Sequence, residues 1–445
     1  MPVSVAILKE NLPGERRVAL VPELVQKLLA HGGFVFRLQQ DAGVGAGFPD
    51  SEYENVEVFP DFETTVAGSD IVLLVNPPQV DEANLLPVGS LLATSLLPHA
   101  NKELMQILVQ RRITGIALEL MPRMSRAQAM NITSSQGTIA GYKAALLAAE
   151  LSPRLWPMVT TPAGTIKPST VVVIGAGIAG LQVIATARRL GARVEAYDIR
   201  PGAREQVESL GASMIETGID VQGTGGHGRA LTEDEKDTQR DVLADVLTRA
   251  HAVICTAALP GRSAPLIVTT DMVEGMPRGG IVVDIAARSG GNCELTEAGR
   301  TVWHGDKRIV GSVDLAGAAS VHSSELYARN MFHLLKFLTT EQGLNLDLND
   351  RILQEIVLTH DGHVTHESTA EQMGVAYTDG ATLTKSDPDS DNDTADGRES
   401  RSGQASRASA GSTNKKADMS LDTTADWVET DDDSPVGNST KPSDK

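Results

Sequence analysis

The feature that most constrains the fold of this chain is a glycine-punctuated stretch over residues 171–198. The apolar run 171–174 has the length and the β-branched content of a strand that is buried on both faces. Glycines 175, 177 and 180 follow in the order G-x-G-x-x-G. A helical segment over 181–190 then leads to Gly191 and to a second strand over 194–197. The stretch therefore predicts a strand, a tight turn, a helix and a parallel strand.

Each glycine of this stretch has a physical reason. Gly175 permits the tight turn, Gly177 lets the backbone approach a pyrophosphate, and Gly180 lets the helix pack closely on the strand. The N-terminus of the helix offers free N–H groups to phosphates. Asp198, at the end of the second strand, is placed to accept hydrogen bonds from a ribose diol. The pattern predicts dinucleotide binding, and a glycine-rich turn in another α/β fold is the alternative.

The residue types after the second strand bear on the choice of dinucleotide. Asp198 favours NAD(H), because a carboxylate at this place repels a 2′-phosphate. Arg200, two residues further on, weakens that preference. We expect NAD(H) as the cofactor.

The length and pattern of the chain indicate two folded domains and a tail. A chain of 445 residues is too long for one core. The expected fold class is α/β, with two doubly wound, Rossmann-like parallel sheets and a cleft between them. Residues 1–135, completed by a returning segment at 318–370, form the first domain, and residues 136–317 form the NAD-binding domain. Ser, Thr, Asp and Gly dominate residues 379–445, which predicts a disordered acidic tail.

The individual elements follow from short apolar runs and their flanking residues. Helices are expected at 22–30, 102–111 and 324–340, a proline-rich linker at 153–168, a small hairpin at 357–363, and strands at 3–8, 34–38, 71–75, 90–95, 115–119, 252–256 and 281–285.

Composition excludes several classes of function. A net charge of −19 argues against nucleic-acid binding, which needs a basic surface. Cys255 and Cys293 lack metal-ligand spacing and cannot form a disulfide framework, so we expect buried thiols and no metal. No apolar run approaches the roughly eighteen residues of a spanning helix, and no secretory signal is evident. We therefore expect a cytoplasmic protein without direct membrane insertion.

The stretch 121–150 allows two interpretations. Its first part is polar and carries Arg123, Arg126 and Gln128, and an alanine-rich helix begins at Ser134 or Ser135 with a serine as the N-cap. It is either an inter-domain connector that ends in a packing helix, or a loop that hangs over the nucleotide. A polar, glycine-rich insertion at 218–229 predicts a mobile surface loop near the site.

Several runs taken together resemble the NAD(H)-binding alpha subunits of proton-translocating NAD(P) transhydrogenases, a family shared with alanine dehydrogenases. The resemblance extends from Lys9-Glu10 to about His366, and only the tail is unmatched. The runs that carry it are Gly290-Gly-Asn-Cys-Glu-Leu-Thr, Arg123-Met-Ser-Arg-Ala-Gln, Ser134-Ser-Gln with Ala140-Gly-Tyr, Gly175-Ala-Gly-Ile-Ala-Gly with Asp198-Ile-Arg, and Glu205-Gln-Val-Glu-Ser-Leu-Gly.

The resemblance implies a function and a set of partners. In this family the component binds NAD(H), an NADP-binding beta subunit holds NADP(H), and hydride passes directly between the two nicotinamides. A membrane subunit couples the transfer to proton movement. The resemblance thus implies a transhydrogenase of the Si-specific/Re-specific type, a homodimer, and a peripheral location at the inner face of the membrane.

The resemblance also implies the site residues. Arg123, Gln128 and Ser134 match the positions at the nicotinamide end and are the expected catalytic residues. The expected cofactor-binding residues are Arg126, Asn131, Gly175, Gly177, Ile178, Gly180, Asp198, Arg200, Gly226, Gln239 and Ala258.

Four positions depart from the family pattern. Asn131 stands where the family has aspartate, and His227 where the mobile loop has tyrosine. Asp314-Leu-Ala replaces Asn-Val-Pro before the closing helix, and Arg288 replaces an acid. These departures leave proton coupling and the partner interface open.

Two other functions stay open. An alanine dehydrogenase needs a lysine, a histidine and an aspartate near its crevice. Here Asn76 stands in the place of the lysine, Arg288 in that of the aspartate, and His99 is the nearest histidine, expected as a surface residue. Arg17 matches the substrate arginine, which transhydrogenases also keep. The third possibility is a non-catalytic NAD(H)-binding regulator.

Overall fold

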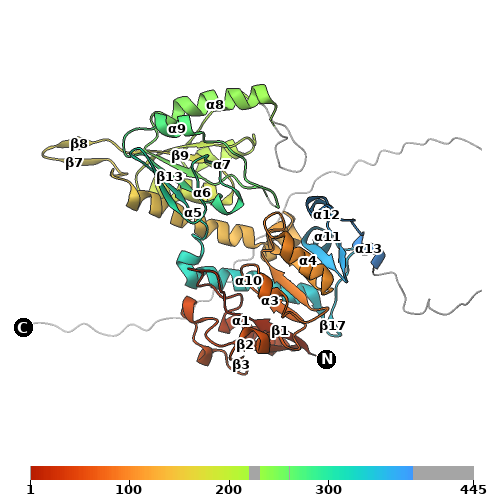
Figure 1. Ribbon diagram of the computed structural model, residues 1–445. Coiled ribbons are helices and arrows are strands. Elements are labelled where there is room, and N and C mark those ends of the chain that lie inside the picture. The colour runs from red at the N-terminus through yellow and green to blue at the C-terminus, as the bar shows by residue number, and fades with distance from the viewer. Residues whose placement is uncertain (1, 220–230, 260, 384–445) are drawn as a thin grey trace, which may run out of the picture. The chain divides into compact units, whose positions relative to one another are not determined.

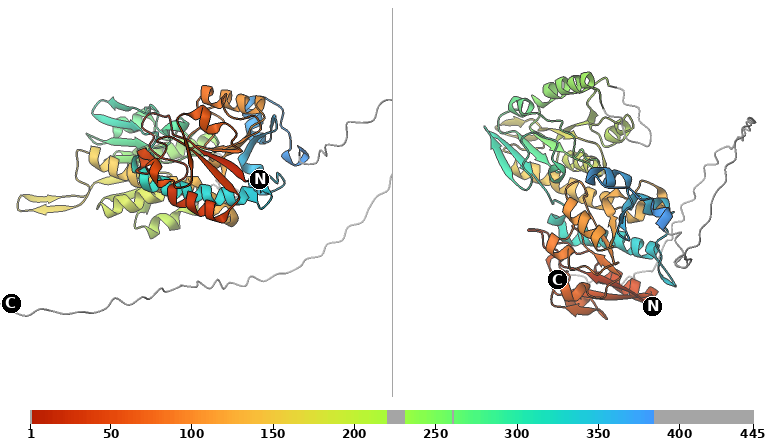
Figure 2. Two further views of the ribbon diagram at one scale, coloured as in Figure 1. Left: turned by 90° about the horizontal axis from the view of Figure 1, so that it is seen from below. Right: turned by 45° about the vertical axis from the view of Figure 1, so that its right-hand side comes forward.

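The computed structural model describes residues 2–219, 231–259 and 261–383. Within these residues two mixed sheets, parallel for the most part, are each covered by helices on both faces (Figures 1 and 2). The predicted Rossmann-like α/β fold class is confirmed.

The first sheet has eight strands in the described part of the chain, in the order β19-β18-β6-β5-β4-β1-β2-β3. Strands β1 to β6 are parallel, and β18 pairs antiparallel with β6. The strands are β1 (Val3–Ile7), β2 (Phe34–Gln39), β3 (Glu57–Phe59), β4 (Ile71–Leu73), β5 (Leu91–Thr94), β6 (Thr114–Ala117), β18 (Val357–His360) and β19 (His363–Val364). The order reverses at β1, whose neighbours are β2 and β4.

Two apolar clusters cover the faces of this sheet, because alternate residues of a strand point to opposite sides. Val5 and Ile7 of β1 pack towards α1, α10 and α11, whereas Ala6 packs towards α2, α3 and α4. The helices of this half are α1 (Pro22–His31), α2 (Phe62–Val66), α3 (Val80–Ala83), α4 (Lys102–Gln110), α10 (Ser320–Leu338), α11 (Arg351–Ile356), α12 (Glu367–Met373) and α13 (Gly380–Leu383).

The second sheet has the order β11-β10-β9-β12-β13-β15-β14 within the described residues. It is parallel except for the edge pair β14 and β15, and its order reverses at β9. The strands are β9 (Thr170–Ile174), β10 (Arg193–Tyr197), β11 (Ser213–Met214), β12 (Ala252–Cys255), β13 (Ile281–Asp284), β14 (Thr301–His304) and β15 (Lys307–Gly311).

Val171 and Val173 of β9 face one apolar cluster and Val172 and Ile174 face the other. The first cluster includes α5, α6 and α7, and the second includes α8 and α9. These helices are α5 (Ile132–Leu151), α6 (Ile178–Arg189), α7 (Ala203–Ser209), α8 (Glu233–Leu247) and α9 (Thr270–Gly275). Helix α5 packs against both α6 and α10.

Short elements connect these layers. They are the 3-10 turns η1 (Val44–Ala46), η2 (Asp50–Glu52), η3 (Leu118–Leu120), η4 (Ser125–Met130), η6 (Ala287–Ser289) and η7 (Gly317–Ala319), and the strand pairs β7 (Val159–Thr161) with β8 (Gly164–Ile166) and β16 (Thr339–Thr340) with β17 (Gly343–Leu344).

The structure corrects four expectations. The proline-rich stretch 153–168 is not only a linker, because it forms the β7–β8 hairpin. The N-cap of α5 is Asn131 rather than a serine. Helix α10 begins four residues earlier than expected, at Ser320. Residues 379–383, assigned to the disordered tail, include α13, and residues 384–445 lie outside the described residues.

Two other expectations are confirmed. Asp361 has a φ of +42° and Gly362 of +83°, and they join β18 to β19 as the expected hairpin turn. Cys255 and Cys293 are free, buried thiols, and burial raises the pKa of both.

Candidate nucleotide-binding site

The turn after β9 requires glycine at two of its three glycine positions. Gly175 has a φ of +92°, and a Cβ on it would lie 2.9 Å from the backbone nitrogen of Ala257. A Cβ on Gly180 would collide with the carbonyl oxygen of Gly175. A Cβ on Gly177 would meet nothing within 4 Å, so the backbone faces open space there. The turn is therefore closely packed at Gly175 and Gly180, whereas open space lies beside Gly177 at the N-terminus of α6.

The carboxylate of Asp198 lies against this turn. Its Oδ2 accepts the backbone N–H of Ala176 at 2.8 Å and Nη2 of Arg200 at 2.9 Å. Its Oδ1 accepts the backbone N–H and Nε of Arg200, at 2.8 and 2.9 Å. A carboxylate has about four acceptor positions, and protein donors fill four here. A ribose hydroxyl must therefore displace a bond from Arg200 before Asp198 accepts it.

Gln239 holds the last residue of β10, Tyr197, by a hydrogen bond. It is buried, and its Nε2 donates to the Tyr197 hydroxyl at 2.5 Å. Burial raises the pKa of Tyr197 to about 12, so the hydroxyl stays protonated. In this structure Gln239 therefore fixes the residue before Asp198.

The loop that carries Ala258 is held in place by the Gly-Gly-Asn-Cys run at 290–293. At the level of sequence this run served only as evidence of family resemblance. Oδ1 of Asn292 accepts the N–H of Ala257 at 2.9 Å, and its Nδ2 donates to the Ala257 carbonyl at 2.8 Å. The carboxylate of Asp284 accepts the N–H groups of Asn292 and Cys293 at 2.7 and 3.1 Å. The Gly-Gly-Asn-Cys run is thus the scaffold beneath residues 257–258. Gly226 and His227 lie outside the described residues.

The polar loop before α5 presents free side chains. Arg123 and Gln128 are exposed and, within the described residues, their side chains make no hydrogen bond. Arg126 instead donates to both oxygens of Asp350, at 2.9 and 2.7 Å. Oδ1 of Asn131 accepts the N–H of Ser134 at 2.9 Å and caps α5. Arg123 and Gln128 thus have the freedom that a ligand-contacting loop needs, whereas Arg126 is bound to Asp350, the N-cap of α11.

A buried ionisable cluster lies at the reversal point of the first sheet. Sequence reasoning considered Arg17, Asn76 and Arg288 one by one and did not predict that they meet. Nε and Nη2 of Arg17 donate to Glu15 at 2.9 and 2.5 Å. Asn76 Nδ2 donates to Glu15 at 2.7 Å and to Glu10 at 3.0 Å. Burial raises the pKa of Glu10 to about 7, whereas the bonds of Arg17 lower that of Glu15 to about 2. The sequence did contain a signal for this cluster: Glu10, Glu15 and Arg17 follow β1, and Asn76 follows β4, so the ends of two neighbouring strands bring them together.

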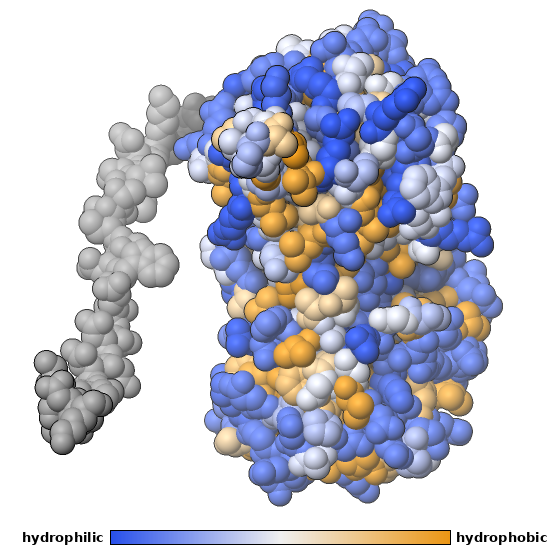
Figure 3. All heavy atoms as spheres, turned by 90° about the vertical axis from the view of Figure 1, so that its left-hand side faces the viewer, coloured by the Kyte–Doolittle hydropathy of each residue, from blue (hydrophilic) through white to orange (hydrophobic). Residues whose placement is uncertain are grey.

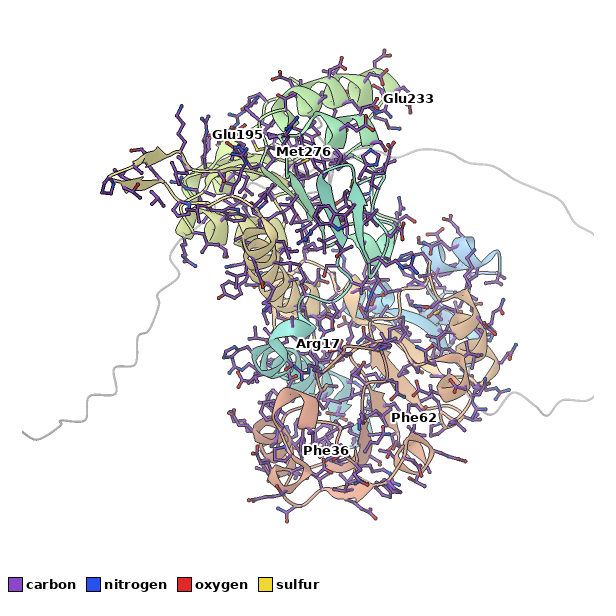
Figure 4. All side chains as sticks on the ribbon, turned by 60° about the vertical axis from the view of Figure 1, so that its left-hand side comes forward. Arg17, Phe36, Phe62, Glu195, Glu233 and Met276 are labelled. Atoms are coloured by element: carbon purple, nitrogen blue, oxygen red, sulfur yellow. The ribbon has the colours of Figure 1, made fainter. Side chains whose placement is uncertain are left out.

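The cluster extends to residues far along the chain. Arg17 Nη1 donates to Oε1 of Gln136 at 2.9 Å, and its Nη2 to Oδ1 of Asp314 at 3.0 Å. Arg288 Nη1 donates to Oδ1 of Asn76 at 2.7 Å. Arg17 lies beside α10 (Figure 4), where the N–H of the next residue donates to Oγ of Ser324. Segments from both sheets therefore meet at this cluster.

His99 is not the surface residue that was expected. Both of its ring nitrogens are buried, without a hydrogen-bond partner among the described residues. Burial lowers the pKa of His99, so the ring is held neutral.

Residues 6–140 match the family described as alanine dehydrogenase/PNT, N-terminal domain, and residues 144–367 match alanine dehydrogenase/PNT, C-terminal domain. The chain belongs to the alanine dehydrogenase/PNT family. This membership confirms the resemblance that the sequence motifs carried.

Relatives within the family are of two kinds. In Rhodospirillum rubrum, the protein that forms the first portion of NAD(P) transhydrogenase subunit alpha is 37% identical over 386 residues, which cover 83% of this chain and 100% of that protein. The NAD(P) transhydrogenase subunit alpha of Haemophilus influenzae is 36% identical, covering 80% and 71%. The alanine dehydrogenase of Bacillus subtilis is 27% identical, covering 84% and 95%. The chain thus has its higher identities with transhydrogenase alpha subunits.

Solved structures agree with this grouping. The crystal structure of transhydrogenase from Sinorhizobium meliloti is 37% identical, covers 82% of this chain and 99% of that chain, and has a TM-score of 0.70. An L-alanine dehydrogenase at 23% identity has a TM-score of 0.69 and shows the shared fold alone. Among the helices described, none is both long and apolar enough to cross a bilayer. The described residues also contain no group of three acidic, histidine or cysteine side chains suited to a metal ion.

Proposed function

We propose that this chain is the NAD(H)-binding component of a proton-translocating transhydrogenase, and that it exchanges hydride with NADP(H) held on a partner subunit. The proposal is supported by the 37% sequence identity that extends over the full length of the Rhodospirillum rubrum protein, and by the geometry of the glycine turn. The membrane subunit and the NADP-binding beta subunit are the proposed partners, at the inner face of the membrane.

The residues at the turn fit NAD(H). The open space above Gly177 leaves room for a pyrophosphate at the N-terminus of α6. Asp198 and Arg200 are placed to meet the adenosine ribose, and the carboxylate opposes a 2′-phosphate. Bound NAD(H) supplies the hydride chemistry through its nicotinamide. The chain itself binds and orients the nucleotide and excludes water from the reacting ring.

The observation that carries the choice between the two kinds of relative is the bond from Arg288 to Asn76. Reduction of a keto or imino acid needs a group that donates a proton. At these two positions the chain has a guanidinium and an amide, joined at 2.7 Å. Neither side chain exchanges a proton near neutral pH. Direct transfer between nicotinamides needs no such group, so this pair favours the transhydrogenase over an amino-acid dehydrogenase.

The exposed loop before α5 supplies residues for the nicotinamide end. Arg123 and Gln128 have free donors, and Ser134 lies in the first turn of α5. We assign these three side chains to fixing the carboxamide and phosphates. Their substitution should slow hydride transfer far more than it weakens NADH binding.

We also propose that the chain is a homodimer that forms through the β7–β8 hairpin. An isolated two-stranded hairpin is marginally stable in water. Leu155, Met158 and Ile166, in and beside this hairpin, are 53%, 65% and 49% exposed. Figure 3 shows apolar surface gathered on this side of the molecule. A second copy would cover these side chains and stabilise the hairpin.

The experiment is cyclic transhydrogenation, in which NADH reduces an NAD analogue only when an NADP(H)-loaded partner domain is present. Turnover that needs both proteins supports the proposal. Alanine-dependent reduction of NAD without a partner would instead assign an amino-acid dehydrogenase. NADH binding without any hydride transfer would indicate a regulator.

A further inference from the structure

The reversal point of the first sheet is a place where α/β proteins bind ligands, outside the carboxyl ends of the strands. In this chain Glu10, Glu15 and Arg17 follow β1 there, and Asn76 follows β4. The chain's own side chains occupy the place: Glu15 is 2% exposed and Arg17 is 7% exposed. A charged pair of this burial costs desolvation energy, so a full set of partners is needed to hold it.

Arg17 obtains these partners from three separate segments. Glu15 takes two of its N–H groups, Gln136 in α5 takes a third, and Asp314 before α10 takes a fourth. Gln136 in turn donates to the carbonyl of Ser323 in α10 at 3.1 Å. One guanidinium thus joins the loop after β1 to α5 and to the segment between β15 and η7.

The α5 contact leads directly to the nucleotide site. Gln136 lies two residues after Ser134, in the first turns of α5. Further along α5, a Cβ on Gly141 would collide with the carbonyl oxygen of Ala179 in α6. The two helices are therefore packed at backbone distance, and α6 carries the phosphate-binding N-terminus. A displacement of α5 cannot be absorbed by side chains at this contact.

Two departures from the family pattern lie in this same network. Asp314 stands in place of the first residue of Asn-Val-Pro and binds Arg17, and Arg288 stands in place of an acid and binds Asn76. Each joins a segment at the second sheet to one at the first sheet. Asp314 forms an ion pair with Arg17, whereas Arg288 donates to the neutral amide of Asn76.

On these contacts, and resting on the proposed transhydrogenase function, we infer that Arg17 is a positioning residue for hydride transfer. Through Gln136 it fixes α5, and with it Ser134, relative to the loop after β1 and to the segment of Asp314. Arg17 is buried, and protein acceptors take the N–H groups of its guanidinium. Its loss should therefore change the rate of transfer rather than the affinity for NADH.

The test compares Arg17→Lys with the wild type and with Arg111→Lys. Arg111 is a matched control, because its side chain also donates two hydrogen bonds, but among the described residues both go to the Leu86 carbonyl. Lysine keeps the charge at position 17 but cannot bond Glu15, Gln136 and Asp314 in one plane. A second variant, Gln136→Met, removes the bond from Arg17 to α5 together with the bond from Gln136 to Ser323, and leaves the Arg17–Glu15 pair.

We expect both test variants to lower kcat of the cyclic reaction roughly tenfold to hundredfold while Kd for NADH changes by less than about twofold. Amide hydrogen exchange should also rise over residues 131–138. Arg111→Lys should change neither quantity. A kcat near that of the wild type in either folded test variant, or equal losses in kcat and NADH affinity, overturns the inference.

The exchange measurement separates this inference from the proposed function. If the wild type binds NADH but transfers no hydride, the proposed function fails. Faster exchange over residues 131–138 in Arg17→Lys and Gln136→Met still supports the positioning role in that case. Exchange unchanged from the wild type in both variants overturns it.

Discussion

The guanidinium of Arg200 holds both oxygens of Asp198, with Nε 2.9 Å from Oδ1 and Nη2 2.9 Å from Oδ2. The hydrogen bond to Asp198 raises the pKa of Arg200, so the guanidinium stays charged. The carboxylate that should accept a ribose is thereby saturated by a residue that could itself bind a 2′-phosphate. The cofactor preference of the site rests on the balance between these two side chains.

Asp198→Ser should shift that preference. Serine removes the negative charge that repels a 2′-phosphate and releases Arg200 to bind one. We expect NADH affinity to fall roughly tenfold and NADPH affinity to rise, since each charge-assisted bond is worth about 1.5–3 kcal/mol. Fluorescence titration with both reduced nucleotides measures the change. Glu205→Gln, at an exposed position of α7, should leave both affinities unaltered. An unchanged ratio of NADH to NADPH affinity in Asp198→Ser contradicts this account.

Two of the glycines should respond differently to alanine. Gly180→Ala places a Cβ against the Gly175 carbonyl oxygen, and overpacking of this kind costs about 1–3 kcal/mol of unfolding free energy. Gly177→Ala places its Cβ in open space, so stability should be kept while NADH affinity falls. Urea unfolding and NADH titration of both variants test the contrast. Equal destabilisation of the two would show that Gly177 is a packing position.

Aspartate should serve as the N-cap of α5 in place of Asn131. Aspartate at position 131 can accept the Ser134 N–H as asparagine does, and its charge favours the positive helix N-terminus by about 0.3–1 kcal/mol. Asn131→Asp should therefore raise the free energy of unfolding slightly at pH 7, whereas Asn131→Ala should lower it by about 1 kcal/mol. Urea denaturation measures both. A more stable alanine variant would exclude the capping role.

The fold was predictable where the determinants are local. The glycine turn, the apolar run 171–174 and the hairpin at Asp361-Gly362 each act within a few residues, and all were found. The bond from Arg17 to Asp314 joins residues 297 apart, and that from Arg288 to Asn76 joins residues 212 apart. Periodicity carries no information on such pairs. The β7–β8 hairpin was missed because the flanking prolines indicate a linker.

Glu10 should make stability fall as pH rises towards neutrality. Burial raises its pKa from 4.5 to about 7, and Glu15, Arg17 and the Tyr327 hydroxyl are the titratable groups nearest to it. Its contribution is therefore complete below about pH 4.5 and is lost as the pH rises through 7. Glu10→Gln should remove this loss, so the unfolding free energy of the variant minus that of the wild type should rise by on the order of 1–3 kcal/mol from pH 4.5 to pH 8. The two proteins are compared by this pH dependence, because the amide nitrogen cannot accept an N–H group of Val75 or Asn76 as the carboxylate does.

Glu15 supplies a control with the opposite sign. The bonds of Arg17 lower its pKa to about 2, so its contribution is present above pH 4.5 and is lost as the pH falls towards 2. The unfolding free energy of Glu15→Gln should lie below that of the wild type by a constant amount from pH 4.5 to 8, whereas the difference for Glu10→Gln should change with pH. Urea unfolding from pH 4.5 to 8 compares the two, and parallel profiles would mean that Glu10 is already ionised at pH 5.

The proposed dimer depends on apolar residues of the hairpin. Met158→Glu should yield a monomer, because the charge cannot be buried against a second copy. Val88→Glu, at a position that is 68% exposed and far from the hairpin in sequence, is the matched control and should stay dimeric. Sedimentation velocity distinguishes the two states. A dimeric Met158→Glu variant would place the interface elsewhere.

The central claim is tested most directly by the cyclic reaction with purified components. The chain is mixed with an NADP(H)-loaded partner domain and NADH, and reduction of an NAD analogue is followed by absorbance. The account predicts turnover that requires both proteins and that falls sharply in Gln128→Ala while NADH affinity is nearly kept. NADH binding without turnover, with a partner shown to be competent by another transhydrogenase alpha subunit, would contradict it.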